Sequence, residues 1–352
     1  MKIKTDYLLV LIVSILAYLF IPDDYLDLYR YYEGAQSISL NESLSQFITD
    51  TIRNRFDFIY FSSFYVVRLL NLPVNLVNAF YVGFCCYQAI NIINYVSVAY
   101  NIKSNNLTLF KLFTVFSVPF IYLFSISRMA AAISFFFLGI NKLLRGYKFL
   151  FIICCILTLF THVGSGIYIF LFIFCYFVAP SILPKVKNSV FILSLLPIIY
   201  IIKKLSELIV NSILNLPFFS SYIFYKTYLT KLEIELIDIS GQSRIVMIHT
   251  LWYVCIYAIG LLNLKNNDRF FSSCKYLYVF VFISLFLSLM FIQRSIMFTF
   301  PLMASIFLID YNQDYMSPKK KLFYRILMYI TILLGVFVFA AYFFRGFFGL
   351  FK

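Results

Sequence analysis

Residues 107–141 read LTLFKLFTVFSVPFIYLFSISRMAAAISFFFLGIN, and only Lys111 and Arg128 in this stretch carry a charge. A helix rises about 1.5 Å per residue and the hydrocarbon core of a bilayer is about 30 Å thick, so one crossing needs roughly 20 apolar residues. The stretch is too long for one crossing, and an ionisable side chain is least costly at the membrane interface. We therefore predict two membrane-spanning helices that meet in a turn at Arg128.

The same pattern occurs twice more along the chain. Residues 149–180 are apolar except for His162, and residues 276–310 are interrupted by Arg294. We predict a turn at each of these two residues and a pair of spans around it. Further apolar runs predict single spans at 6–21, 75–99, 188–202, 245–263 and 323–344. The predicted fold class is all-α, a polytopic integral membrane helical bundle of about eleven transmembrane helices.

Composition supports a bilayer location and excludes a water-soluble enzyme. The chain has 352 residues, of which 62% are hydrophobic and 12% are charged, whereas soluble domains have about 45–50% apolar and about 25% charged residues. The formal net charge is +14. Its basic residues are scattered in short segments between apolar runs, which argues against nucleic acid as a partner.

The distribution of the basic residues predicts an orientation. With the N-terminus in the cytoplasm, the cytoplasmic segments hold 16 Lys and Arg residues and 4 acids. The basic residues include the triplet Lys319-Lys320-Lys321. This excess is the pattern expected of cytoplasmic loops. It requires that residues 56–70 lie in the interface or re-enter instead of crossing. The whole chain, 1–352, is then one transmembrane domain with two outer segments at 22–74 and 203–244, of which the second is amphipathic.

Cysteine and histidine usage argues against a metal centre or a disulfide framework. The chain has seven Cys and two His, and no two Cys have the Cys-x-x-Cys spacing. A buried free Cys behaves as a small hydrophobic residue. We expect neither a metal site nor a cofactor.

Ionisable and aromatic residues gather on the predicted outer side. Arg128, His162 and Arg294 occupy predicted turns there, and Arg244 lies where the second outer segment re-enters the bilayer. The first outer segment brings carboxylates and tyrosines, namely Asp23, Asp24, Tyr25 and Tyr29. Guanidinium groups suit phosphate and pyrophosphate, and aromatic faces suit sugar rings and isoprenoid chains. A membrane lipid with a pyrophosphoryl sugar is one ligand that uses both.

Structural roles for the same residues remain open alternatives. An arginine at a helix end also anchors a helix among lipid headgroups. His162 is equally suited to a turn in which it hydrogen-bonds a backbone carbonyl. Asp23 and Asp24 are suited to capping the next helix, and tyrosines near 29–32 are typical of an interfacial aromatic belt.

Several short patterns resemble the EpsG-type family of polysaccharide polymerases, which includes O-antigen polymerases (Wzy). The first pair is Ser127-Arg128-Met129-Ala130-Ala131-Ala132, followed by Thr161-His162-Val163-Gly164-Ser165. The His comes 34 positions after the Arg. The others are Asp23-Asp24-Tyr25 with Tyr29, Arg55-Phe56-Asp57-Phe58-Ile59, and Gln293-Arg294. At the position of Arg55-Phe56-Asp57-Phe58-Ile59, the family more usually has an acid-Pro-Gly pattern.

The resemblance implies a membrane glycosyltransferase of the GT-C type in the bacterial inner membrane. Such an enzyme moves the growing glycan from undecaprenyl pyrophosphate onto a new lipid-linked repeat unit at the periplasmic face, and a separate co-polymerase partner sets chain length. Arg128, Arg294 and Arg244 are then the candidates for the developing pyrophosphate charge. His162 or Asp24 is the candidate base. The candidates for further substrate contacts are Asp23, Tyr25, Tyr29 and Arg55.

Two other functions are compatible with the same residues. A different lipid-linked-sugar glycosyltransferase or a ligase uses similar pyrophosphate chemistry, although a ligase usually has a larger outer domain. A flippase or transporter of the lipid-linked unit needs charged residues deep within its spans and usually a repeat of two halves. The strong charges here fall at predicted helix ends, which favours transfer chemistry.

Overall fold

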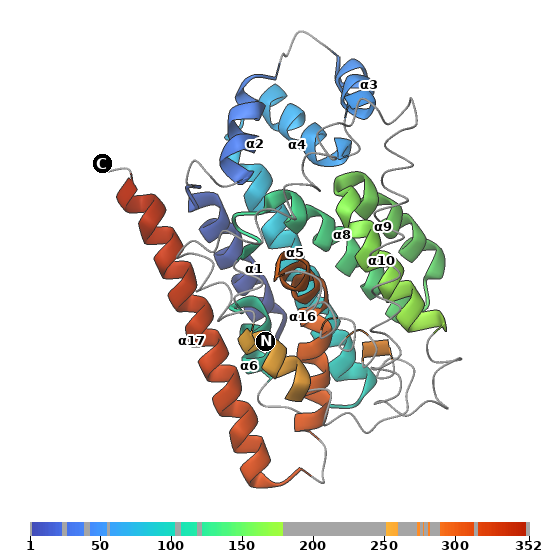
Figure 1. The fold of residues 1–352 in the computed structure, drawn as a ribbon, viewed down its shortest axis with the longest axis vertical. Helices are drawn as coiled ribbons and strands as arrows, with labels where there is room; N and C mark the ends of the chain where they lie inside the picture. Colours follow the sequence, from blue (N-terminus) through green and yellow to red (C-terminus); the bar gives the residue numbers. More distant parts are fainter. Residues whose placement is uncertain are drawn as a thin grey trace. The chain divides into compact units, whose positions relative to one another are not determined.

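The computed structural model describes residues 2–22, 27–38, 43–54, 57–102, 107–117, 122–178, 251–259, 273–274, 277, 281, 289–312 and 316–349. Every regular element within these ranges is a helix (Figure 1), as predicted. Two compact units divide the chain: Met1–Ile169 with Met297–Lys352, and Phe170–Ile296. The predicted spans at 188–202 and the amphipathic segment at 203–244 lie outside the described residues, as does most of 245–263, of which 251–259 are helical.

Four described helices are long and apolar enough to cross a bilayer, and the chain is a helical membrane protein. They are Asn75–Ala99, Ser127–Leu144, Arg294–Tyr311 and Pro318–Ala340. Shorter apolar helices accompany them, and the predicted total of about eleven spans stays a prediction.

Helix α5 (Asn75–Ala99) lies at the centre of the first unit, antiparallel to α1 (Lys2–Leu19) and parallel to α8 (Ser127–Leu144). A Cβ atom built on Gly83 would come within 2.0 Å of Ser14 Oγ, so α1 and α5 are in close contact, and a larger residue at position 83 would force the Ser14 side chain to move. The amide of Asn141 in α8 donates to the carbonyl and the side-chain oxygen of Gln88 at 3.0 and 2.9 Å. These contacts fix the register of the three helices.

Helices α8 and α9 (Lys148–Thr161) form an antiparallel hairpin, as the predicted spans require. The turn between them contains Gly146 with φ +88°, a conformation that glycine adopts without steric cost. Along the arms, a Cβ atom on Gly139 would lie 2.9 Å from Cys154 Cβ, so the two helices are in close contact. The hairpin therefore brings its first turn, with Arg128, and its last turn, before His162, to the same end.

The predicted breaks at Arg128 and at His162 are confirmed. Arg128 is the second residue of α8, and the described residues just before the helix, 123–126, are not helical. His162 has extended backbone and separates α9 from the 3-10 turn η1 (Val163–Ser165), which leads into α10 (Gly166–Ile173) and the π-helical η2 (Phe174–Val178).

The predicted turn at Arg294 is wrong. Helix α16 runs without interruption from Leu289 to Tyr311, and Arg294 is its sixth residue. A guanidinium near a helix end reaches the interface by extending its apolar stem along the helix, so a single Arg does not require a turn. Pro301, further along, is also accommodated within the helix.

The second part of α16 packs with α6 (Leu107–Val115) and α17 (Pro318–Gly349) in the first unit. The rings of Phe113 and Phe300 lie 5.1 Å apart, and those of Phe307 and Tyr324 lie 4.9 Å apart. The span in α16 is almost wholly buried, whereas the outward side chains of α17, such as Leu333 and Phe337, are 67% and 71% exposed. Such an apolar exposed face is suited to contact with lipid.

Three short helices cover the end of the bundle that carries Arg128: α2 (Asp27–Gln36), α3 (Leu44–Asn54) and α4 (Phe58–Leu69). We call this end, formed by the starts of α5 and α8 and the ends of α1 and α9, the Arg128 end. Arg68 Nη1 ties α4 to the last carbonyls of α2, donating to Ala35 O at 2.9 Å and also to Gln36 O. With 12 residues α4 is about 18 Å long, too short to cross the hydrocarbon core; its interfacial location stays a prediction.

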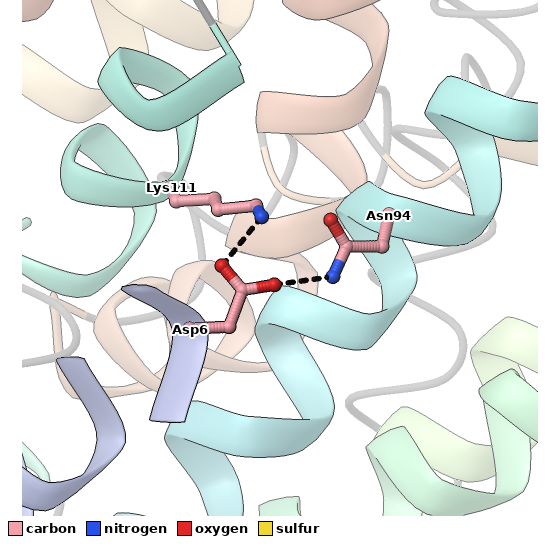
Figure 2. A network of polar contacts seen from close by, with 3 residues as sticks. All are labelled: Asp6, Asn94 and Lys111. Atoms are coloured by element: carbon pink, nitrogen blue, oxygen red, sulfur yellow. Dashed lines mark hydrogen bonds and ion pairs between the residues drawn. The ribbon is translucent and has the colours of Figure 1, made fainter. Parts of the chain in front are cut away.

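The opposite end of the unit is held by a buried ionic network, which we call the Asp6 end (Figure 2). Lys111 Nζ of α6 lies 2.6 Å from Asp6 Oδ1 of α1, and Asn94 Nδ2 of α5 donates to Asp6 Oδ2 at 2.9 Å. Both carboxylate oxygens are therefore bonded, by side chains from two further helices. The network links α1, α5 and α6 at one point.

Candidate functional site

A second ion pair lies at the Arg128 end. Arg128 Nη1 donates to Asp57 Oδ2, and Asp57 directly precedes α4. The Asp57 side chain is 2% exposed and the Arg128 side chain is 25% exposed. The pair thus joins α4 to α8 through a buried carboxylate and a guanidinium that reaches the surface of the unit.

Aromatic rings from α2 and α4 surround this pair. The Arg128 guanidinium carbon lies 5.4 Å from the centre of the Tyr31 ring, within the range of a cation–π contact. Tyr31 in turn packs edge-to-face on Tyr60 at 5.3 Å and on Phe61 at 5.9 Å. The Tyr31 ring therefore limits the orientations of the guanidinium.

Three buried polar atoms in this region have no hydrogen-bond partner among the described residues: Asp57 Oδ1, Tyr60 Oη and Ser127 Oγ. The Ser127 hydroxyl approaches that of Tyr60 without completing a hydrogen bond, and Tyr60 also lies in the field of Arg128. Burial raises the pKa of the Tyr60 hydroxyl well above its ordinary value, so it stays a proton donor. Because buried polar groups are nearly always bonded in folded proteins, such a concentration favours a ligand site.

His162 lies at the same end, after the last turn of α9. Its N–H donates to Thr158 O at 3.0 Å, and its carbonyl accepts from the Ser165 N–H at 2.9 Å and the Ser165 hydroxyl at 2.6 Å. Its imidazole lies over Gly164, where an added Cβ atom would be 3.1 Å from Nε2. The backbone of His162 thus has the turn role that sequence left open, while its half-buried ring is held over a glycine.

One aromatic contact links the two features. The rings of Phe58, which follows Asp57, and Phe160, two residues before His162, lie 5.1 Å apart. Since α4 packs on the end of α9, it brings the Arg128–Asp57 pair and His162 to one end of the bundle.

An apolar groove of about 590 Å³ opens beside α4, between α3 and α5. Its lining includes Ile48, Val66, Leu76 and Phe80, and its polar groups are hydroxyls. The Ser63 hydroxyl and the Tyr81 hydroxyl are 2.6 Å apart and satisfy each other. A groove of this width and polarity is suited to a hydrocarbon chain.

Two further predicted site residues lie in the described part of the chain. Arg294 belongs to the second unit, and Tyr29 is a half-buried residue of α2. Several others lie outside the described residues, namely Asp23, Asp24, Tyr25, Arg55 and Arg244. Within the described part of the chain no group of three His, Cys, Asp or Glu residues is placed to hold a metal ion.

Asp57 is the site residue that sequence reasoning missed. It was noted within Arg55-Phe56-Asp57-Phe58-Ile59 without any role of its own. The available signal was an acid placed directly before an aromatic run in a segment expected at the interface. Its burial and its partner 71 positions later depend on tertiary packing.

A family model described as the EpsG family matches residues 5–350, nearly the whole chain. Neither the curated proteins nor the solved structures include a significant match to the chain.

Proposed function

The chain belongs to the EpsG family, and from this premise we propose that it polymerises a surface polysaccharide, such as an O-antigen, at the periplasmic face of the bacterial inner membrane. Family membership implies a membrane polysaccharide polymerase that uses lipid-linked sugars. In the proposed reaction the growing glycan on undecaprenyl pyrophosphate is the donor, and a new lipid-linked repeat unit is the acceptor. The enzyme is a multi-pass glycosyltransferase of the GT-C type.

The chemistry needs positive charge where the leaving group forms. An acceptor hydroxyl attacks the anomeric carbon of the donor, the new glycosidic bond forms, and the bond to pyrophosphate breaks. The electron pair leaves with the lipid pyrophosphate, and its charge is stabilised by fixed cationic donors. Arg128 is our first candidate, because its guanidinium is a permanent cation with planar N–H donors and its side chain is 25% exposed. Arg294 and Arg244 are the further candidates.

His162 is assigned to the same site, either as the base or as an imidazolium that holds a phosphate oxygen. Asp24 is the second candidate base from sequence. The remaining proposed substrate contacts are Asp23, Tyr25, Tyr29 and Arg55. One observation carries the proposal: a partly exposed Arg128, in contact with the half-buried ring of Tyr31, lies at the same end of the α8–α9 hairpin as His162.

The groove beside α4 is assigned to the isoprenoid chain of a lipid substrate. It is lined by apolar side chains from α3, α4 and α5, close to the helix that carries the ion pair.

The test is gel analysis of surface glycan from cells that lack the chain and carry it back as wild type, His162→Ala, Arg128→Ala or Arg294→Ala. A polymerase predicts that cells without the chain attach a single repeat unit and lose the ladder of longer glycans. We expect all three variants to shorten or abolish the ladder at normal protein levels in the membrane.

Other outcomes separate the alternatives. Loss of the single unit itself would indicate flipping of the lipid-linked unit or its ligation. Full ladders from three well-expressed variants would contradict the assigned site. Association of the chain with a chain-length co-polymerase is tested separately, by co-purification. Its result does not affect the outcomes above.

A further inference from the structure

The Asp57 carboxylate is bonded on one side only. Its Oδ2 accepts from Arg128, whereas Oδ1 is buried and has no hydrogen-bond partner among the described residues. Asp57 occupies the N-cap position of α4, where an aspartate usually accepts from the helix N–H groups. It makes no such side-chain hydrogen bond here. The carboxylate is therefore turned away from its usual local partners and toward the ion pair.

An unbonded carboxylate oxygen in a buried site calls for a donor that the described residues do not supply, which a bound ligand can provide. A metal cation is disfavoured, because the Arg128 guanidinium already lies on the same carboxylate. A phosphate oxygen would be repelled by the negative charge. A neutral hydroxyl group fits, since it donates one hydrogen bond and adds no charge.

The surroundings match a sugar that carries this hydroxyl. Tyr31 presents a ring next to the pair, and Tyr60 has a protonated hydroxyl with no partner among the described residues. Ring faces pack on the apolar face of a pyranose, and a phenol donates to a ring or hydroxyl oxygen. Carboxylate, phenol and ring come from α2 and α4, which are fixed together by Arg68.

We propose that Asp57 is the base of the transfer reaction and that its Oδ1 receives the acceptor hydroxyl of the incoming sugar. This inference rests on the proposed polymerase function. As the hydroxyl oxygen bonds to the anomeric carbon, its proton passes to Asp57 Oδ1 and the pyrophosphate leaves with the electron pair of the broken bond. Asp57 is neutral after the step, and Arg128 is released from its negative partner to bind the new negative charge on the pyrophosphate.

This coupling assigns separate tasks to the residues at the Arg128 end. Proton transfer belongs to Asp57, charge stabilisation to Arg128, and phosphate binding to His162, whose ring is held over Gly164. A single proton movement then both activates the nucleophile and prepares the cation for the leaving group.

The experiment uses membranes that contain the full-length chain and the cell's own extracted lipid-linked repeat unit. Elongation is measured against pH for wild type, Asp57→Asn and Asp57→Glu. We expect Asp57→Asn to elongate at least about 100-fold more slowly, and its residual rate to lose the decline on the acid side that protonation of the base causes in wild type. Asp57→Glu moves the carboxylate by one methylene, so it should slow elongation about tenfold or more and keep that decline.

The matched control is Glu33→Gln, which removes an exposed acid from α2 and should elongate at the wild-type rate. An acid-side decline that persists in Asp57→Asn would show a structural role and overturn the assignment. Where Asp57→Asn does not accumulate, a wild-type rate for Asp57→Glu overturns it equally. If wild type itself fails to elongate the unit, the proposed function fails first, and this outcome is distinguishable because it involves no variant.

Discussion

Two buried ion pairs hold the first unit at its opposite ends, and they differ in how completely they are satisfied. At the Asp6 end, Lys111 and Asn94 bond both oxygens of one carboxylate (Figure 2). At the Arg128 end, Arg128 bonds one oxygen of Asp57 and the other has no partner within the described structure. The Asp6 side chain is 17% exposed and the Asp57 side chain 2%, yet only the less buried carboxylate has both oxygens bonded.

The difference indicates which pair serves the fold and which serves a ligand. A fully bonded network stabilises the positions of its helices. A half-bonded carboxylate lowers the stability of the fold, so its presence favours a role outside folding. The cation differs in the same way: the Lys111 side chain is 6% exposed, and that of Arg128 is 25% exposed. Exposure of a guanidinium beside a buried acid leaves room for an anion to approach.

Breaking the Asp6–Lys111 pair should have the largest effect. Lys111→Met leaves Asp6 buried without its cation, which typically costs about 3–5 kcal/mol. We expect a marked loss of thermal stability of the purified protein, measured as Tm in detergent. Adding Asp6→Asn to Lys111→Met should recover much of the loss, because the buried charge is then removed. An unchanged Tm for Lys111→Met would place this pair outside the structural core.

Breaking the Asp57–Arg128 pair should reduce activity as well as stability. Arg128→Gln keeps a polar group but removes the charge, and we expect elongation to fall about 10²- to 10³-fold, as for other donors to a developing anion. Tm should also fall, because the Asp57 side chain, which is 2% exposed, then loses its cation. Adding Asp57→Asn should recover Tm but not elongation. Arg145→Gln, an exposed Arg at the opposite end of α8, is the matched control and should retain activity. Recovery of elongation together with Tm in the double variant would make the two pairs alike.

Removing hydroxyl and amide groups should sharpen the contrast. Tyr60→Phe deletes a buried hydroxyl that has no partner among the described residues, so it should leave Tm unchanged or raise stability by up to about 1 kcal/mol. Elongation should nevertheless fall. Asn94→Leu deletes a bonded amide and should lower stability by about 1–3 kcal/mol. Equal losses of stability from both substitutions would contradict the distinction.

The smallest effect is expected in the apolar groove. Val66→Trp places a large side chain in it without touching either ion pair. We expect the apparent KM for the lipid-linked unit to rise about tenfold or less, with kcat nearly unchanged. Val98→Trp, at an exposed position of α5 outside the groove, is the control. A fall in kcat alone would argue against a lipid chain in this groove.

Sequence was sufficient for the features that depend on local patterns. A single ionisable residue in a long apolar run located the breaks at Arg128 and His162, because charge is costly inside a bilayer. The same argument failed at Arg294, where α16 continues through the charged position. A lone Arg in an apolar run can place its charge at the membrane interface in two ways: the chain turns there, or the side chain extends along the helix. The sequence pattern is the same in both cases.

The pairing of charges was beyond sequence for a different reason. Asp57 and Arg128 are 71 positions apart, and Asp6 and Lys111 are 105 apart. Which acid meets which cation depends on the register that Gly83 and Gly139 permit through close helix contacts. Neither contact has a local signature, so the candidate site predicted from sequence included Arg128 and His162 but not the carboxylate that pairs with Arg128.

The α8–α9 hairpin makes the chain separation of Arg128 and His162 a measure of the length of its two arms. The two residues are 34 positions apart because α8 runs away from Arg128, the chain turns at Gly146, and α9 returns to the same end. Each added residue lengthens one arm by about 1.5 Å and rotates everything beyond it by roughly 100°. A relative with a longer hairpin therefore has to lengthen both arms together, in steps near a whole helical turn, to keep its Arg and His at the same end and facing in the same directions.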